Sequence, residues 1–562
     1  MGFRELLKGW LSGRQGAQTD GPRGSAAPAQ GMPEADRWCL EGAEHLAKGQ
    51  LEQAEQAVAR ALECRHDHAE ALLVQSAVFM KQQRLEEATD SLVLATHFRP
   101  DLAEAHYHLG VIAAAQGRSD EAEDSLRRAI AREPLHAKAQ NALGTLLSAR
   151  GDVEEAVSCF YRAITARPEL AQAHSNLGCL LITELDQFEE GAEHISTAYR
   201  LAPDAPDVKC NWAMLLQYRG QYHTALARWS EAIESGGLAN EAKARVDRAL
   251  VLLLLGNFRS GWEEYEKRFD ADRRAVRDFG LPRWQGEPLA QKTILVYAEQ
   301  GVGDEIMFAS CLPDVMGMAG RVVVECSDRL EAVFRRSFPG AVFHGGKKDD
   351  SGDWLAECGL VDYQVPIGSL PRHFRPGRES FPGAYPYLRA DAQRVESWRT
   401  RLRQDGNRPA IGISWRGGTA RTRGQTRSLP PEFLAKILRP DFTWVSLQHG
   451  ADETHAPAGL RVYPGVTWDL DELAALMGAL DLVVSVDNTN VHLAGALGRP
   501  VWVLLSGISE WRYGTGTDAM PWYPSARLLR CSQDEDWDAI LATLVLELEH
   551  RFAQPGAQPV SD

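Results

Sequence analysis

The sequence has few cysteines and no long apolar run. Its nine cysteines are scattered over 562 residues, and none forms a C-x-x-C pair. This spacing argues against both a disulfide framework and a cysteine-ligated zinc site, and free thiols are typical of a reducing compartment. No stretch approaches the roughly 18 apolar residues of a membrane span, and the N-terminus lacks the apolar core of a secretory signal. We therefore expect a cytoplasmic protein.

The chain also lacks an excess of positive charge. It has 61 Lys and Arg against 77 Asp and Glu, which gives a formal net charge of -16. Proteins that bind nucleic acid carry a basic patch or stripe, so this composition argues against that class of partner. The length exceeds what one hydrophobic core supports and predicts roughly three or four domains.

Signatures of several enzyme classes are missing too. There is no Gly-x-Ser-x-Gly elbow and no P-loop. Two Asp-x-Asp pairs, DAD (270–272) and DLD (469–471), superficially resemble an Asp-x-Asp pair that binds a metal ion. The first lies in a polar linker, and the second precedes a helical segment that it can cap. We expect no metal site and no bound cofactor.

What the sequence does contain is an internal repeat. Small residues recur with a period of 34 residues at Ala54, Ala88, Ala122 and Ala156, then at Gly191 and Ala225. Prolines recur with the same period at Pro100, Pro134 and Pro168, then after 35 residues at Pro203. The change in spacing from 34 to 35 residues predicts one inserted residue near 182–187. The period resembles the tetratricopeptide repeat, and it predicts an array over residues 37–268 whose last repeat, from about 238, is degenerate.

Such an array forms an α-solenoid whose concave face binds peptides or partner helices. Asn176 and Asn211 occupy the same position of successive repeats. Their amides could hold a peptide backbone by paired hydrogen bonds. We expect a protein or peptide partner on this face, and the alternative is a scaffold for oligomerisation.

The segments outside the predicted domains are polar or rich in Gly and Pro. Residues 1–36 combine an amphipathic stretch over 1–15 with a disordered linker. That stretch predicts a helix in peripheral contact with a membrane or partner, or simply a frayed helix. A second linker covers 269–291, and a polar tail covers 553–562.

Between linker and tail, short apolar runs alternate with helical patterns. The runs are TILVYA (293–298), RVVVEC (321–326), AIGISW (410–415), FTWVSLQ (442–448), DLVVSV (481–486) and PVWVLL (500–505). Continuous β-branched runs separated by helices indicate parallel sheets covered on both faces. We predict an α/β region of two Rossmann-like halves, 292–405 and 406–552, with a closing helix at about 536–551.

Polar turns follow the predicted strands, where such sheets bind ligands. After the first strand come Gln300, Gly301 and Gly303, and then Asp304 at the start of a helix. Asp304 could accept a proton from a hydroxyl there, or it could merely cap the helix. Glu305 is expected to be a helix-turn residue stabilised by the dipole. A dinucleotide site would need a glycine where Ile306 stands, and would use Glu325 for a ribose.

In the second half the turns are basic or rich in hydrogen-bonding groups. Candidate ligand- and phosphate-binding residues are Ser414, Arg416, Arg427, Gln448, Asp487, Asn488, Thr489 and His492. Four arginines occur in the first of these turns, namely Arg416, Arg421, Arg423 and Arg427. Arginine suits phosphate, although the turn could be a solvated basic surface and His492 could be structural.

Several ordered motifs together resemble a known family. They are EQGVGDEIMF (299–308), ISWRGG (413–418) with RSL (427–429), VSLQHG (445–450), VDN (486–488) with HLAGALGRPVWVLL (492–505), and WYPSARLLRC (522–531). This combination, with the junction GNFRSGWEEYEKRF (256–269), resembles the bacterial tetratricopeptide-repeat proteins that carry a C-terminal glycosyltransferase family 9 (heptosyltransferase-like) domain.

The resemblance implies a GT-B fold and metal-independent, inverting transfer from a nucleotide diphosphate sugar. It implies that Asp304 is the base, that Asp487 and His492 bind the donor, and that Arg427 is the cation of a mobile loop. The half at 292–405 would face the acceptor and the half at 406–552 the donor.

Two departures from the family pattern leave the activity open. Asn488 stands where threonine is usual, and the segment EWRYGTGTDAMPWYP (510–524) differs from the usual Trp-Arg-Trp run. Three hypotheses follow: transfer to a protein or peptide recruited by the repeats, transfer to a lipid-linked or surface saccharide, and a non-catalytic repeat scaffold with a relic transferase domain.

Overall fold

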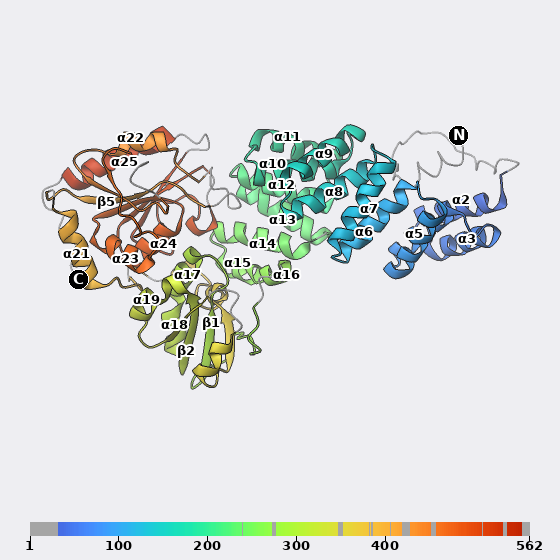
Figure 1. The fold of residues 1–562 in the computed structure, drawn as a ribbon. Helices are drawn as coiled ribbons and strands as arrows, with labels where there is room; N and C mark the ends of the chain where they lie inside the picture. Colours follow the sequence, from blue (N-terminus) through green and yellow to red (C-terminus); the bar gives the residue numbers. More distant parts are fainter. Residues whose placement is uncertain are drawn as a thin grey trace. The chain divides into compact units, whose positions relative to one another are not determined.

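The structure is a computed structural model and divides into two compact units, Met1–Pro203 and Asp204–Asp562 (Figure 1). It describes residues 32–238, 240–272, 277–346, 352–381, 383, 386–404, 406–418, 427–450, 457–507, 510–531 and 537–553. The helix expected over 1–15, Arg421, Arg423 and the tail from 554 lie outside these ranges.

The first unit consists of paired helices. They are α2 (Glu34–Ala47), α3 (Leu51–Cys64), α4 (Ala69–Lys81), α5 (Leu85–Phe98), α6 (Ala103–Ala115), α7 (Ser119–Arg132), α8 (Ala137–Arg150), α9 (Val153–Ala166), α10 (Ala171–Glu184) and α11 (Phe188–Leu201). The periodic small residues are buried where two helices meet, as for Ala122 and Ala156. At Gly144 a Cβ atom would lie 2.8 Å from the ring of Phe160, so a larger residue at this helix crossing would require that ring to shift.

The predicted one-residue insertion is confirmed in the α10–α11 turn. In the other repeats of this unit, the backbone N–H that precedes the second helix donates to the carbonyl five residues earlier, as from Asp152 to Leu147. Between α10 and α11 the bond runs from Gln187 to Leu181, six residues earlier. The extra residue is accommodated by Asp186, which adopts a left-handed φ of 59°.

The second unit begins with more helices of the same kind. They are α12 (Pro206–Tyr218), α13 (Tyr222–Ser235), α14 (Glu241–Leu254), α15 (Phe258–Tyr265) and α16 (Arg268–Ala271). Leu254, Trp262 and Tyr265 belong to the same hydrophobic core as the strands that follow. The helices run to Ala271, a few residues past the predicted end of the array, and the division between compact units falls earlier, after Pro203.

The first sheet is parallel and has the strand order β3-β2-β1-β4. Its strands are β1 (Thr293–Tyr297), β2 (Arg321–Ser327), β3 (Val342–Gly346) and β4 (Tyr363–Pro366). The intervening helices are α17 (Val302–Phe308), α18 (Leu312–Met318), α19 (Asp328–Ser337) and α20 (Leu370–Phe374). The register pairs Val296 of β1 with Val324 of β2 and with Val365 of β4.

The second sheet is also parallel, with the order β10-β9-β8-β5-β6-β7. Its strands are β5 (Ala410–Ser414), β6 (Thr443–Ser446), β7 (Leu460–Arg461), β8 (Leu482–Val486), β9 (Val501–Leu505) and β10 (Ala526–Arg530). Its helices are α21 (Ala392–Leu402), α22 (Leu434–Ile437), α23 (Leu470–Ala479), α24 (Thr489–Ala496) and α25 (Trp537–Ala553).

Both faces of the second sheet are covered, as the continuous apolar runs predict. Val501 and Val503 of β9 pack into one core, whereas Trp502 and Leu504 pack into another on the opposite face. Figure 1 shows α22 and α25 on one side of this sheet and α23 and α24 on the other. The α/β prediction for this region is confirmed.

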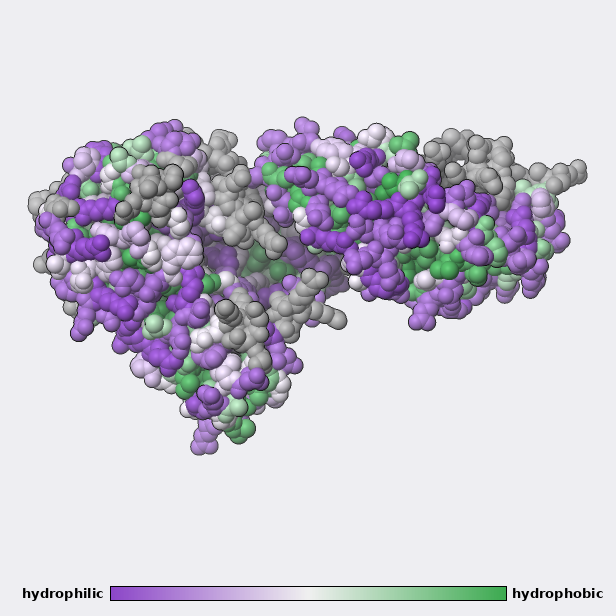
Figure 2. Space-filling model, viewed as in Figure 1, coloured by the Kyte–Doolittle hydropathy of each residue, from purple (hydrophilic) through white to green (hydrophobic). Residues whose placement is uncertain are grey.

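The viewed face in Figure 2 is mainly hydrophilic, with scattered hydrophobic patches. No helix within the described ranges combines the length and the apolar character needed to cross a bilayer.

Candidate functional site

In each sheet the strand order reverses at one point, and the predicted site residues lie there. The reversal falls between β1 and β4 in the first sheet and between β5 and β8 in the second. Ligands of open parallel sheets bind beyond the carboxyl ends of the strands at such a point. Asp304 follows β1, Ser414 ends β5, and Asp487 follows β8.

The two sheets meet through the turn that carries Asp304. Gly301 caps α17, and Asp304 is the third residue of that helix. Arg512 donates to Asp304 Oδ1 from Nη2 at 2.6 Å and from Nε at 3.0 Å. Arg512 belongs to a short 3₁₀ segment (Trp511–Tyr513) that follows β9 in the second sheet. A carboxylate of one half is thus held by a guanidinium of the other.

Gly303 permits this approach. A Cβ atom at this position would lie 3.2 Å from Cδ2 of His492 and 3.5 Å from Oγ1 of Thr489. Both of those residues are on α24, so the first turn of α17 contacts the helix that follows β8. Gly303 therefore serves a close contact between the two halves.

Asp487 is buried among polar partners. Tyr513 donates to its Oδ1 at 2.6 Å, and Arg427 Nη2 forms an ion pair with its Oδ2 at 2.7 Å. Burial raises the pKa of Asp487, and the Arg427 charge opposes that rise. Burial also raises the pKa of Tyr513, so its hydroxyl stays a donor.

His492 is a neutral side chain in this site. It is 4% exposed, and its Nδ1 lies 3.1 Å from the Tyr523 hydroxyl. Burial, followed by the nearby charge of Arg512, lowers the pKa of His492 to about 3. The imidazole therefore cannot attract an anion by charge near neutral pH, although it can donate or accept a hydrogen bond.

The Asn488 amide ties β5 to β8. Its Nδ2 donates to Ser414 Oγ at 2.7 Å and to the Arg416 carbonyl at 3.0 Å. Its Oδ1 caps α24 by accepting from the Asn490 N–H at 2.9 Å. Gln448 Oε1 accepts from the Arg416 N–H at 2.8 Å, while the Arg416 side chain is exposed. These groups organise the turn after β5.

Glu305 and Glu325 both have structural roles. Glu305 lies in the first turn of α17, as expected from the sequence, and it is also buried, with its Oε2 accepting from the Ser327 N–H at 2.8 Å. Glu325 receives Arg277 Nη1 at 2.6 and 2.7 Å on its two oxygens. A carboxylate held in this way is not presented to a ribose.

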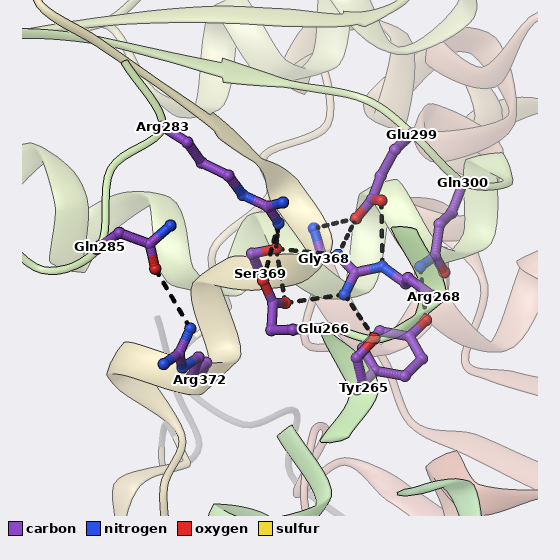
Figure 3. Close-up of polar contacts among 10 residues, drawn as sticks. All are labelled: Tyr265, Glu266, Arg268, Arg283, Gln285, Glu299, Gln300, Gly368, Ser369 and Arg372. Atoms are coloured by element: carbon purple, nitrogen blue, oxygen red, sulfur yellow. Dashed lines mark hydrogen bonds and ion pairs between the residues drawn. The ribbon is translucent and has the colours of Figure 1, made fainter. Parts of the chain in front are cut away.

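The last repeat anchors the turn that leads to Asp304, as Figure 3 shows. Arg268 points at Glu299, the residue two positions after β1, with Nη2 2.6 Å from Oε1. The same Nη2 donates to Ser369 Oγ at 3.0 Å, beyond the end of β4. The Gln300 amide donates to the Tyr265 hydroxyl at 2.5 Å. Side chains of α15 and α16 thus fix the start of this turn.

The two asparagines of the repeats lie in different units. Asn176 donates to Asn141 Oδ1 at 3.1 Å and to Thr145 Oγ1 at 3.2 Å, both on the first helix of the preceding repeat. Asn211 lies on α12 in the second unit and is partly buried. The amide of Asn176 is thus used between repeats, and peptide binding by either residue stays a prediction.

Sequence reasoning missed the segment that closes the site. In the sequence, residues 510–524 were only a departure from the family pattern. In the structure this segment contacts three predicted site residues: Arg512 contacts Asp304, Tyr513 contacts Asp487, and Tyr523 contacts His492. The signal that could have found them was a pair of strongly hydrogen-bonding aromatics beside an arginine in an otherwise irregular stretch. Within the described part of the chain, no group of three or more His, Cys, Asp or Glu side chains is placed to hold a metal ion.

Comparisons with known proteins identify the repeats. The model of the tetratricopeptide repeat family matches residues 92–137, 107–171, 141–206 and 210–267. Protein FlbA of Caulobacter vibrioides (strain ATCC 19089 / CIP 103742 / CB 15) is 31% identical over 372 residues, which are 62% of this chain and 62% of FlbA. The matched part thus spans less than two thirds of that relative.

Solved structures resemble parts of the chain. A crystal structure of MamA is 23% identical and covers 29% of this chain and 94% of its own, with a TM-score of 0.26. The crystal structure of YrrB, described as a TPR protein with an unusual peptide-binding site, is 22% identical and covers 31% of this chain and 90% of its own, with a TM-score of 0.26. The matches of the family model show that the helical array contains tetratricopeptide repeats over residues 92–206 and 210–267.

Proposed function

We propose that the chain is an inverting, metal-independent glycosyltransferase of the GT-B type. It moves a sugar from a nucleotide diphosphate sugar to a hydroxyl group, on a protein or peptide recruited by the repeats. The observation that carries the proposal is the 2.6 Å contact between Asp304 and Arg512, which joins the carboxyl ends of the two sheets. The resemblance of the motifs to glycosyltransferase family 9 supplies the class of reaction.

The side chains support a simple mechanism. Asp304 takes the proton of the acceptor hydroxyl, whose oxygen attacks the anomeric carbon of the donor. The bond from that carbon to the diphosphate oxygen breaks, and the nucleoside diphosphate leaves with the electron pair. Arg427 and Arg512 lie where they would offset the charge that develops on the leaving group.

Tetratricopeptide repeats support the choice of a protein acceptor, because such arrays bind peptides and partner helices. The last repeat is continuous with the candidate site through Tyr265 and Arg268. A lipid-linked or surface saccharide is the alternative acceptor. It would draw on residues 1–15, which lie outside the described ranges.

The base is tested by the change Asp304→Asn. We expect transfer or donor hydrolysis to fall by about 100-fold or more, since general-base catalysis contributes on the order of 10²–10⁴-fold. Product formation is measured by intact mass on proteins that co-purify with the repeats. Asp328→Asn is the matched control, because Asp328 occupies the first turn of α19 after β2. Turnover that is unchanged in Asp304→Asn would remove this residue as the base.

Donor binding is tested separately by thermal shift with UDP-, GDP-, ADP- and CMP-sugars, with and without EDTA. Binding to the folded state alone raises the melting temperature, and a ligand at 100 times its Kd adds about 2.7 kcal/mol. We expect a shift with at least one donor that persists in EDTA. A flat response to every donor would contradict the proposal.

A non-catalytic repeat scaffold is the second candidate, and one observation favours it. Asp304 Oδ1 is already neutralised by Arg512, and the Asn488 amide is engaged within the protein. This candidate predicts that neither an added donor nor Asp304→Asn changes any measured property. The only activity that it predicts is partner binding by the repeats.

A further inference from the structure

Five charged side chains alternate in sign where the two sheets meet. Asp304 contacts Arg512 at 2.6 Å, and Asp487 contacts Arg427 at 2.7 Å. Glu510 lies between the two arginines, with its Oε2 3.8 Å from Arg512 Nη1 and its Oε1 4.0 Å from Arg427 Nη1. The row therefore runs from a carboxylate of the first half to a carboxylate of the second.

Glu510 is the loosest member of this row. Its distances to the two guanidinium groups exceed the 2.7–3.2 Å or so of a hydrogen bond, whereas the two aspartates are in direct contact with theirs. Its side chain is 32% exposed, against 18% for Arg512 and 7% for Asp487. One carboxylate thus bridges two guanidinium groups without bonding closely to either.

We propose that Glu510 occupies the place of an oxyanion, and that the diphosphate of the donor displaces it and binds between Arg427 and Arg512. Guanidinium groups match phosphate oxygens in pairs and bind them more strongly than neutral donors do. The inference rests on the proposed function for the identity of the diphosphate, but the site itself is defined by the charges.

The exchange also acts on Asp304. When Arg512 turns its donors to a phosphate, it shares or releases Asp304 Oδ1, which then becomes available to an acceptor hydroxyl. The base is engaged with Arg512 while the site is empty and becomes available when the donor is bound. Arg512 is thus both a ligand of the leaving group and the positioning residue of Asp304.

The balance of charges in the row predicts whether each substitution raises or lowers the affinity for an anion. The row holds three carboxylates and two guanidinium groups, so a polyanion can bind only by replacing a carboxylate. Glu510→Gln removes the competitor, and Asp304→Asn releases Arg512, so both should tighten anion binding. Arg512→Gln removes a ligand and should weaken it.

The experiment is isothermal titration of the full chain with inorganic pyrophosphate in EDTA. Hydrogen bonds to charged groups contribute about 1.5–3 kcal/mol, which corresponds to a roughly 10- to 100-fold loss of affinity for Arg512→Gln. We expect Glu510→Gln and Asp304→Asn to bind several-fold more tightly than wild type. Arg527→Gln and Glu547→Gln are matched controls, because this half-buried pair joins β10 to α25 away from Arg512, and both should bind as wild type does.

A gain of affinity cannot arise from misfolding, so Glu510→Gln remains informative even if Arg512→Gln fails to fold. The proposal is overturned if Glu510→Gln binds pyrophosphate no better than wild type, or if no variant binds it. Tightening by Glu510→Gln without any sugar transfer would keep the oxyanion site and reject the transferase. If sugar transfer depends on Asp304 but Glu510→Gln leaves the affinity for pyrophosphate unchanged, the transferase is kept and the oxyanion site is rejected.

Discussion

His492 illustrates how burial decides the chemistry of a single residue. From the sequence it was a candidate contact for pyrophosphate, and its charge state could not be inferred. In the structure it is enclosed beside Tyr523, and burial lowers its pKa to about 3 from the ordinary value of 6.5. A histidine that stays neutral when folded but gains a proton when unfolded links stability to pH.

This linkage predicts a loss of stability on mild acidification. Between pH 7.5 and 5.5 the unfolded state takes up a proton at His492 that the folded state refuses, so stability falls as the pH falls toward the folded pKa. The loss is about 1.4 kcal/mol over this interval, and it should be absent in His492→Gln. Urea unfolding at both pH values, followed by tryptophan fluorescence, measures it. His97→Gln, on the exposed side of α5, is the control, and equal losses in wild type and His492→Gln would reject the linkage.

Single residues after strands could be found from the sequence, but their partners could not. Asp304 and Asp487 stand out because each follows an apolar run at a turn. Arg512 lies 208 residues from Asp304, and no local pattern connects the two. Their pairing depends on the packing of α17 against α24, which is set by side chains throughout both halves.

At the scale of elements, the sequence predicts the central strands of the two sheets and misses the strands at their edges. The six predicted strands are confirmed as β1, β2, β5, β6, β8 and β9. The four that were missed, β3, β4, β7 and β10, are the edge strands of the two sheets. Edge strands have one neighbour and need no continuous β-branched run, so their composition resembles that of loops.

The helix pairs make a sharper prediction at Gly178. A Cβ atom there would lie 2.5 Å from the carbonyl oxygen of Gly191 on α11, which is backbone and cannot rotate away. Gly178→Ala should therefore lower the free energy of unfolding of the first unit by about 1–3 kcal/mol. Circular dichroism during urea unfolding measures this.

The matched control is Gly317→Ala in α18. A Cβ atom at Gly317 meets no atom within 4 Å, and alanine is favoured over glycine in a helix by up to about 1 kcal/mol. This variant should be as stable as wild type or more so. If Gly178→Ala is equally stable, the helices are not packed as closely as described.

At the scale of the whole molecule, the repeat period and the compact units do not coincide. The period continues to residue 268, but α14 and α15 share a core with the first sheet. Trp262 is 1% exposed, and its indole N–H donates to the Arg375 carbonyl at 3.0 Å. The last repeat is therefore part of the α/β module.

This arrangement predicts where the chain can be cut. A fragment of residues 204–562 should fold and melt cooperatively, because it retains a whole compact unit. A fragment of residues 269–562 should not, because it exposes the surface buried by Leu254, Trp262 and Tyr265. Each such side chain contributes about 1.5–3 kcal/mol, against a total of 5–15 kcal/mol or so. Differential scanning calorimetry compares the melting of the two fragments. Equal transitions in both would contradict the assignment of the last repeat to the α/β module.

The sequence by itself determined the period of the helices, the inserted residue within 182–187, the buried strands and the turns that carry Asp304 and Asp487. These features are local, because spacing and burial impose them within one or two elements. Only the tertiary structure decided that Arg512 meets Asp304, that Glu510 lies between two arginines, and that the last repeat belongs to the sheets. These contacts join residues far apart in the chain, and they depend on how the packed cores bring the ends of two sheets together.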